Sequence, residues 1–221
     1  MQRRMFLLAC AACSVGAHAA GLSEGDAAGG VRTALERGAI SAVGLLGRTD
    51  GFLGNPRVRI PLPEGLESVA KLMRALGQQR KVDELVTAMN RAAEAAVPEA
   101  KTLLVQAVRQ MSVEDAWGIV RGGETSATEF FERKTREPLG ERFLPIVTRA
   151  TQRVSLAQKY DALAAKAVGF GLLKQEDASL ERYVTGKALD GLFLMIGDEE
   201  KKIRQDPIGT GSAILRRIFG G

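Results

Sequence analysis

The sequence predicts an all-α fold: a single multi-helix domain of about eight to ten helices, with a buried central C-terminal helix and one extended, proline-containing segment. Aromatic residues make up only 5% of the 221-residue chain, and strong helix formers such as Ala, Leu, Glu, Lys and Arg dominate. Apolar side chains recur every three to four residues along most of the chain, as on the buried face of a helix. Helix-capping residues, glycines and prolines separate these stretches.

The first element is an export signal and not part of the fold. Arg3 and Arg4 precede an apolar run, Met5 to Val15, which is followed by the small-residue site Ala17-His18-Ala19. The run is too short to cross a bilayer, which needs about 20 apolar residues. We therefore expect cleavage between Ala19 and Ala20, which removes residues 1–19. The mature domain, residues 20–221, is then periplasmic and has no transmembrane segment.

The export route stays open between two alternatives. Residues 3–7, Arg-Arg-Met-Phe-Leu, resemble the twin-arginine motif, although Gln2 replaces the usual Ser or Thr. An ordinary Sec signal also needs a positive N-terminal region and fits equally. Cys10 is preceded by an apolar run of only about five residues, below the usual 7–15, so we expect no lipid anchor.

Loss of the signal removes whole classes of chemistry from the mature chain. Cys10, Cys13 and His18 are the only cysteines and histidine, and all three lie within residues 1–19. This excludes Ser-His-Asp triads, Cys-His pairs and the usual zinc, copper and haem sites, so we expect no metal and no cofactor. The mature chain keeps 29 basic against 26 acidic residues, a mild excess without a basic block, so we expect no nucleic-acid partner.

The first half predicts helices on either side of an extended segment. The apolar spacing predicts a helix over residues 26–47, followed by a loop to residue 56. Residues 57–63 alternate charged and apolar side chains and contain two prolines, which predicts an extended segment along the domain. Three more helices are predicted over residues 64–76, 82–97 and 98–111.

Capping patterns organise the next stretch. Ser112-x-x-Asp115 predicts a capping box that opens a short helix, which Gly122-Gly123 ends after Arg121. Ser126-x-x-Glu129 predicts a second capping box. Pro138 is expected to start a separate helix, which Pro145 kinks or restarts.

The last third of the chain predicts three helices, and the second of them is buried. Ser155-x-x-Gln158 predicts a capped helix with a stripe from Leu156 to Ala167. A long helix over residues 178–204 is apolar on every side at its centre, Asp190 excepted, which is typical of a central helix. Ion pairs four residues apart, Asp198–Lys202 and Glu200–Arg204, should support its end. Residues 208–221 predict a short amphipathic helix that packs back onto the domain.

Several stretches carry a family resemblance. They are Asp115-Ala-x-Gly-Ile-Val-x-Gly-Gly, Phe143-Leu-Pro-Ile-Val, Lys187-Ala-Leu-Asp-Gly-Leu-Phe-Leu-Met-Ile and Asn55-Pro-Arg-Val-Arg-Ile-Pro-Leu-Pro. With them, nearly all of the mature chain resembles a family of uncharacterised exported bacterial proteins known only as a domain of unknown function. The resemblance implies an α-helical domain in the envelope of a Gram-negative bacterium. It implies no activity and assigns no residue a role.

Three groups of residues are candidates for a site. Asp190 is a carboxylate in an apolar helix centre, where burial would raise its pKa; a structural pair with Lys187 is the interpretation we favour. Arg57 and Arg59 would lie on one side of an extended segment and would hold a phosphate or carboxylate, or cover a helix with their stems. A further group surrounds the turn before residue 126, where free N–H groups could bind an anion unless a capping box uses them: Trp117, Gly122, Gly123 and Thr128.

These features favour an exported, non-catalytic protein that binds a partner protein or a small apolar ligand in the envelope. One alternative is a carboxylate-dependent hydrolase of cell-wall glycans, for which Glu114, Glu129 and Glu132 are the candidate acids. The other is a structural envelope component that uses its terminal helix as a contact. We assign no catalytic residue and no metal ligand.

Overall fold

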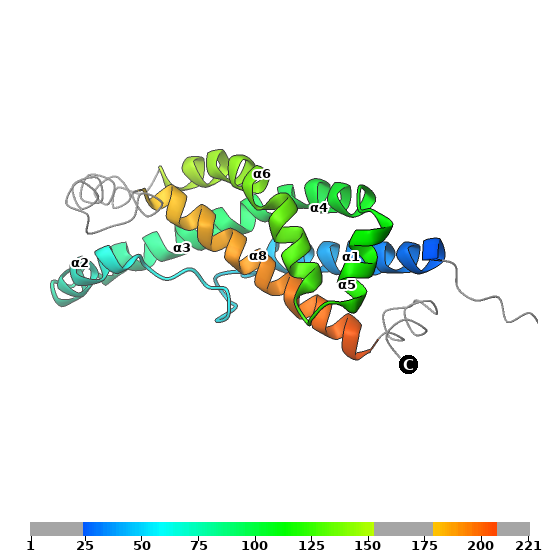
Figure 1. Cartoon of the computed structure of the whole chain (residues 1–221). Helices are drawn as coiled ribbons and strands as arrows, with labels where there is room; N and C mark the ends of the chain where they lie inside the picture. The colour runs from blue at the N-terminus through cyan, green and yellow to red at the C-terminus, as the bar shows by residue number, and fades with distance from the viewer. Residues whose placement is uncertain (1–23, 153–178, 207–221) are drawn as a thin grey trace, which may run out of the picture.

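The helix at the centre of the molecule is α8 (Leu180–Gln205), which packs against α1 (Glu24–Leu46), α3 (Gln79–Ala96) and α6 (Ser126–Thr151) (Figure 1). The computed structural model of the protein describes residues 24–152 and 179–206. All regular secondary structure in these ranges is helical, which confirms the all-α, single-domain prediction. The remaining elements are α2 (Glu64–Ala75), η1 (Val97–Glu99), α4 (Ala100–Arg109) and α5 (Val113–Arg121).

Most helix ends lie within about three residues of their predicted positions. The capping box that opens α5 is confirmed, since Ser112 Oγ accepts from the N–H of Asp115 and the Asp115 carboxylate accepts from the N–H of Ser112. The fourth predicted helix begins with the 3₁₀ turn η1 around Pro98, because a proline is tolerated where the first N–H groups have no partner.

The prediction of a separate helix starting at Pro138 is wrong. α6 runs without a break from Ser126 to Thr151 and contains both Pro138 and Pro145. Each proline removes one N–H donor and crowds the preceding turn, which bends a helix that other contacts hold together. Figure 1 shows α6 changing direction along its length. Buried side chains on both sides of the prolines hold it to the core: Phe131, Leu139, Phe143 and Val147.

The prediction that α8 is apolar all round is correct for most of its circumference and wrong for one stripe. Val184, Ala188 and Leu192 are fully buried. Asp190 and Leu194 are exposed instead, and Asp190 keeps 49% of its side chain in solvent. The central helix therefore presents one strip of its surface to the outside.

Some predictions fall outside the described residues: the signal with Ala19 and Ala20, the Ser155–Gln158 capping box with the Leu156–Ala167 stripe, and the terminal helix over 208–221. Within the described ranges, no helix is both long and apolar enough to cross a membrane.

Candidate functional site

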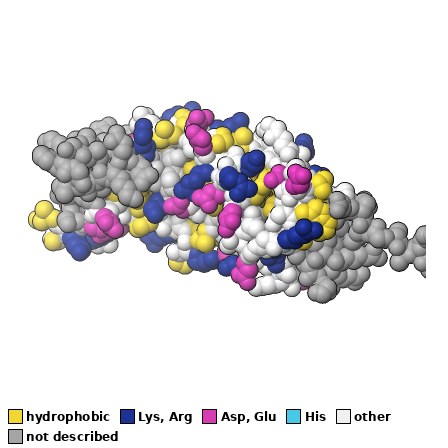
Figure 2. Space-filling model, in the orientation of Figure 1, with side chains coloured by type: hydrophobic (Ala, Val, Ile, Leu, Met, Phe, Trp, Pro, Cys, Tyr) yellow, Lys and Arg dark blue, Asp and Glu magenta, His cyan; other side chains and the backbone are white. Residues whose placement is uncertain are grey.

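The exposed strip of α8 forms the floor of an open groove, called the α8 groove here. The groove has two adjoining hollows of about 570 Å³ and about 370 Å³, which share Arg57, Asp190 and Leu194. One wall is the segment over residues 57–64, and the other is the first half of α6. Figure 2 shows basic and acidic side chains interleaved over the middle of this face. The lining also includes Arg59, Leu62, Thr128, Glu132, Arg136, Tyr183, Lys187, Asp198 and Lys201.

Asn90 of α3 holds the extended wall in place. The N–H of Ile60 donates to Oδ1 of Asn90 (2.9 Å), and Nδ2 of Asn90 donates to the C=O of Ile60 (3.0 Å) and of Val86 (2.8 Å). The side-chain amide thus pairs with Ile60 as a neighbouring β-strand would. Asn90 is fully buried and Ile60 is 1% exposed, so these bonds replace the water that both groups lose.

Glu94, one turn further along α3, holds the loop that leads into this wall. Its Oε1 accepts from the N–H of Phe52 (3.0 Å) and of Leu53 (3.1 Å), and its Oε2 accepts from Arg91 (2.6 Å). Arg91 also donates to Asp50 (2.8 Å). The hydrogen bond to Glu94 raises the pKa of Arg91 most, and the hydrogen bond to Asp50 raises it further. The nearly buried Glu94 carboxylate therefore has both N–H donors and an opposite charge.

Gly191 allows the loop to approach α8 closely. Phe52 is fully buried, and a Cβ placed on Gly191 would lie 2.7 Å from Cε1 of Phe52 and 3.3 Å from Cβ of Val58. Any larger residue at position 191 must displace an aromatic ring from the core. The absence of a side chain here sets the distance between the extended wall and the floor of the groove.

Ion pairs join both walls to the floor. Arg57 makes a two-pronged contact with Asp198, with Nη2 3.0 Å from Oδ1, and this hydrogen bond raises the pKa of Arg57. Arg136 donates to Asp190 (2.6 Å) and to Glu132 (2.7 Å). Burial lowers the pKa of Arg136, but hydrogen bonds and charge attraction from these two carboxylates outweigh burial and raise it.

Asp190 is exposed and lies in a structural ion pair, so the alternative of a buried carboxylate is wrong. Its closest cation is Arg136 of α6, and Lys187 lies 3.7 Å away on its own helix. The predicted pair with Lys187 is therefore present, and the shorter contact, with Arg136, joins α6 to α8. Position 190 faces the groove because α8 turns this strip away from the core.

Three cations in the groove remain available to a ligand. Arg59 and Lys201 are exposed and have no ion pair among the described residues. Lys187 has a long contact with Asp190 (3.7 Å) and lies over the Tyr183 ring, 5.9 Å from its centroid, and its side chain stays exposed. Arg57 and Arg59 both line the groove as the sequence predicted, although Arg57 lies in a turn and is held by Asp198.

The predicted capping box at the start of α6 is wrong, because a carboxylate from α8 takes its place. Oε1 of Glu200 accepts from the N–H of Ala127 (2.9 Å), and Oε2 accepts from the N–H (2.9 Å) and the hydroxyl (2.8 Å) of Thr128. The Ser126 hydroxyl instead donates to the carbonyls of Ile119 and Gly123. An anion favours the N-terminus of a helix, and this protein supplies that anion from its own chain.

Arg204 completes this arrangement. It donates to Glu200 (2.8 Å), to the Ser126 hydroxyl (2.7 Å) and to the C=O of Ile119 (2.9 Å). The pair of Glu200 and Arg204 four residues apart is thus confirmed. The other predicted pair is wrong, since Asp198 contacts Arg57 and Lys202 contacts Glu199 (2.6 Å).

The remaining candidates do not join the groove. Trp117 is half-buried on α5 with the Arg121 guanidinium 5.1 Å from its ring centroid. Gly122 and Gly123 form the turn before α6, and a Cβ on Gly122 would lie 2.6 Å from Cβ of Ser126. Thr128 does line the groove, but its hydroxyl already donates to Glu200. The turn therefore closes a corner of the fold.

The three candidate acids are dispersed. Glu114 is exposed on α5, Glu129 accepts from the Thr125 hydroxyl (2.9 Å), and Glu132 pairs with Arg136. The described residues contain no group of three or more metal-binding side chains.

Comparison with known proteins adds one match. The model of a family described as "Protein of unknown function (DUF4197)" matches residues 21–220, nearly the whole chain. No curated protein and no solved structure matches it. The family match confirms the resemblance to a domain of unknown function. The chain belongs to the family of proteins of unknown function called DUF4197.

Proposed function

We propose that this is an exported, non-catalytic binding protein of the cell envelope, and that the α8 groove holds an extended segment of a partner protein. The observation that carries the proposal is the groove itself, an open channel along α8 with one wall pinned by Asn90 and Glu94. A pre-formed groove costs little conformational entropy when a chain binds along it.

The sizes of the spaces favour a protein segment over a small apolar ligand. Small-molecule sites enclose about 300–1,000 Å³ and bury most of the ligand. An apolar hollow between α1, α5, α6 and α8 measures only about 20 Å³, far too small for such a ligand. The α8 groove is large enough but open along its length, which suits a chain that enters from the side.

The charges in the groove favour binding over catalysis. Asp190, Asp198 and Glu132 are each held by an arginine. A general acid or base needs a carboxyl group within hydrogen-bond reach of its substrate, and these three carboxylates already contact arginines of the protein itself.

The same charges indicate what the partner segment carries. Arg59, Lys187 and Lys201 lie along the groove beside the exposed apolar surface of Leu194 and the wall residue Leu62. A segment that combines carboxylates with apolar side chains would complement both kinds of surface.

Co-purification from the envelope fraction of the native host tests the proposal with two matched variants. Leu194→Asp places a charge in the groove, and Ile40→Asp makes the same change on α1 outside it; the two side chains are similarly exposed, at 42% and 37%. We expect a protein partner to be lost with Leu194→Asp and kept with Ile40→Asp. Equal retention by both variants would overturn the proposal, as would native mass spectrometry that finds a small ligand retained by Leu194→Asp.

A further inference from the structure

The hairpin formed by α2 and α3 ends in a tip that no other described helix covers. α2 packs chiefly on α3, and the pair extends from one end of the molecule (Figure 1). Leu72 and Leu76 lie four residues apart near this tip, and their side chains are 61% and 65% exposed. They are the most exposed large apolar side chains of the described chain.

The exposure of these leucines belongs to a well-formed turn and is not a frayed helix end. Gly77 has φ +73°, in the left-handed region that favours glycine. Its N–H donates to the C=O of Arg74 (3.1 Å), and the N–H of Gln78 donates to the C=O of Met73 (2.8 Å). These two bonds make a Schellman motif, the common C-terminal cap of a helix. The cap fixes Leu76 at the outer end of α2.

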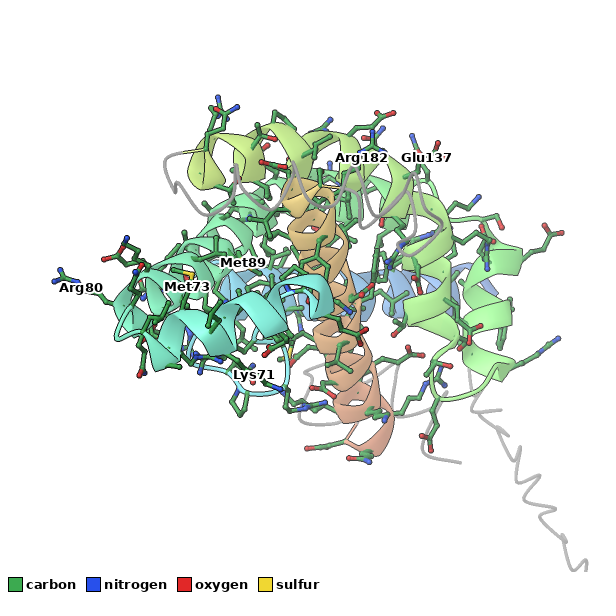
Figure 3. All side chains as sticks on the ribbon, turned by 90° about the vertical axis from the view of Figure 1, so that its left-hand side faces the viewer. Lys71, Met73, Arg80, Met89, Glu137 and Arg182 are labelled. Atoms are coloured by element: carbon green, nitrogen blue, oxygen red, sulfur yellow. The ribbon has the colours of Figure 1, made fainter. Side chains whose placement is uncertain are left out.

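The stretch that carries the two leucines is basic, with acidic residues only beyond its two ends, at Glu67, Asp83 and Glu84. Residues 71–81 contain four basic residues and no acidic one. All four are exposed, and Figure 3 shows Arg80 reaching away from the molecule near the turn, with Lys71 on the same hairpin. Of these four residues, only Arg80 has an ion pair with another described residue, an exposed contact with Glu84 at 3.3 Å. The four are Lys71, Arg74, Arg80 and Lys81.

We propose that the tip of the α2–α3 hairpin, residues 71–81, is a docking surface for anionic phospholipid membranes. Leu72 and Leu76 would enter the headgroup region while the four cations contact lipid phosphates. A helix-hairpin tip that exposes two apolar side chains and four cations fits a lipid surface, which supplies many phosphates without a fixed geometry. A protein partner would need a matching concave acidic pocket. This surface is separate from the α8 groove, so the proposal does not depend on the partner-binding function.

Vesicle flotation of residues 20–221 tests the proposal. This form keeps the whole described fold and lacks the apolar run of residues 5–15, which would bind lipid by itself. We expect binding to vesicles that contain phosphatidylglycerol, little binding to pure phosphatidylcholine, and loss of binding at high salt, because salt screens exposed charges. Equal binding to both vesicles, or none to either, would overturn the proposal.

Two pairs of variants locate the contact. Leu72→Ser/Leu76→Ser should weaken binding by at least about tenfold, since two apolar side chains no longer leave water. Lys71→Gln/Arg74→Gln should weaken binding by about 25-fold, at about fivefold per cation, and should reduce its salt dependence. The controls change exposed positions elsewhere: Ile40→Ser on α1 replaces one exposed apolar side chain, and Arg133→Gln/Lys134→Gln on α6 removes the same number of charges as the test pair.

The controls decide between specific docking and general attraction. If Arg133→Gln/Lys134→Gln weakens binding as much as Lys71→Gln/Arg74→Gln does, net charge alone accounts for it and the proposal fails. If the wild-type chain ignores vesicles but forms a discrete protein complex that Leu72→Ser/Leu76→Ser abolishes, the tip docks a protein and the lipid proposal also fails. Circular dichroism of each variant confirms that the helices persist, as expected for substitutions at exposed positions.

Discussion

Removing the amide of Asn90 should release the extended wall of the groove at a predictable cost. In Asn90→Ala, the N–H and C=O of Ile60 lose their partners while Ile60 stays buried. An unsatisfied buried polar group costs about 1–3 kcal/mol. Val86 keeps its backbone helix bond, so two groups are left without a partner. We therefore expect the free energy of unfolding to fall by about 2–6 kcal/mol.

Urea unfolding measures this loss, and two further variants separate its causes. Asn90→Leu refills the volume without restoring the hydrogen bonds, so it should also be strongly destabilising. Thr87→Ala changes an exposed position on the same helix and should shift the free energy by less than about 0.5 kcal/mol. Hydrogen exchange should show faster exchange at the Ile60 N–H than in the wild type. An Asn90→Ala variant as stable as Thr87→Ala, with Ile60 still protected, would refute the reasoning.

Three further predictions can be checked in the same urea assay. Gly191→Ala should cost about 1–3 kcal/mol because its Cβ would meet the Phe52 ring at 2.7 Å, and Phe52→Leu in the same chain should recover part of that loss; no recovery would contradict the packing argument. Glu200→Ala should cost about 2–4 kcal/mol, since it removes the cap of α6 and the charged hydrogen bonds between Glu200 and Arg204. A loss below about 1 kcal/mol would show that water caps the helix equally well. Gly77→Ala should lower stability by about 1 kcal/mol because of its left-handed φ. Gly186→Ala, inside α8 with open space around it, should raise stability by about 0.5–1 kcal/mol. A change of the same sign in both variants would contradict the left-handed conformation of Gly77.

The regular helices could be predicted because their signals are local. Apolar spacing located α1, α3 and α8, and the pattern Ser112-x-x-Asp115 located the start of α5. The prolines of α6 misled the prediction because a proline breaks a helix only where tertiary packing does not hold both halves. Buried Phe131 and Phe143 lie on either side of Pro138 and supply that packing.

The groove could be predicted only in part, because its walls are joined by contacts between distant segments. Arg57, Arg59 and Asp190 were recognised as candidates, but nothing local shows that they share one surface. Asn90 and Glu94 did leave a signal, since both are polar residues beside the apolar stripe of α3, where a buried polar group needs a specific partner.

The start of α6 shows a stronger limit of local patterns. The spacing of Ser126 and Glu129 satisfies the rule for a capping box, yet Glu200, more than seventy residues away, caps the helix. A local rule cannot exclude a distant side chain that binds the same donors better.

Photo-crosslinking from inside the groove tests the central claim most directly. A photoreactive amino acid at position 194 would report on the floor of the α8 groove, and the same residue at position 40 would report on an equally exposed site on α1. In cells of the native host, we predict one discrete protein adduct from position 194, none from position 40, and a crosslinked peptide that combines acidic and apolar residues. Adducts of equal yield at both positions, or none at position 194, would contradict the account.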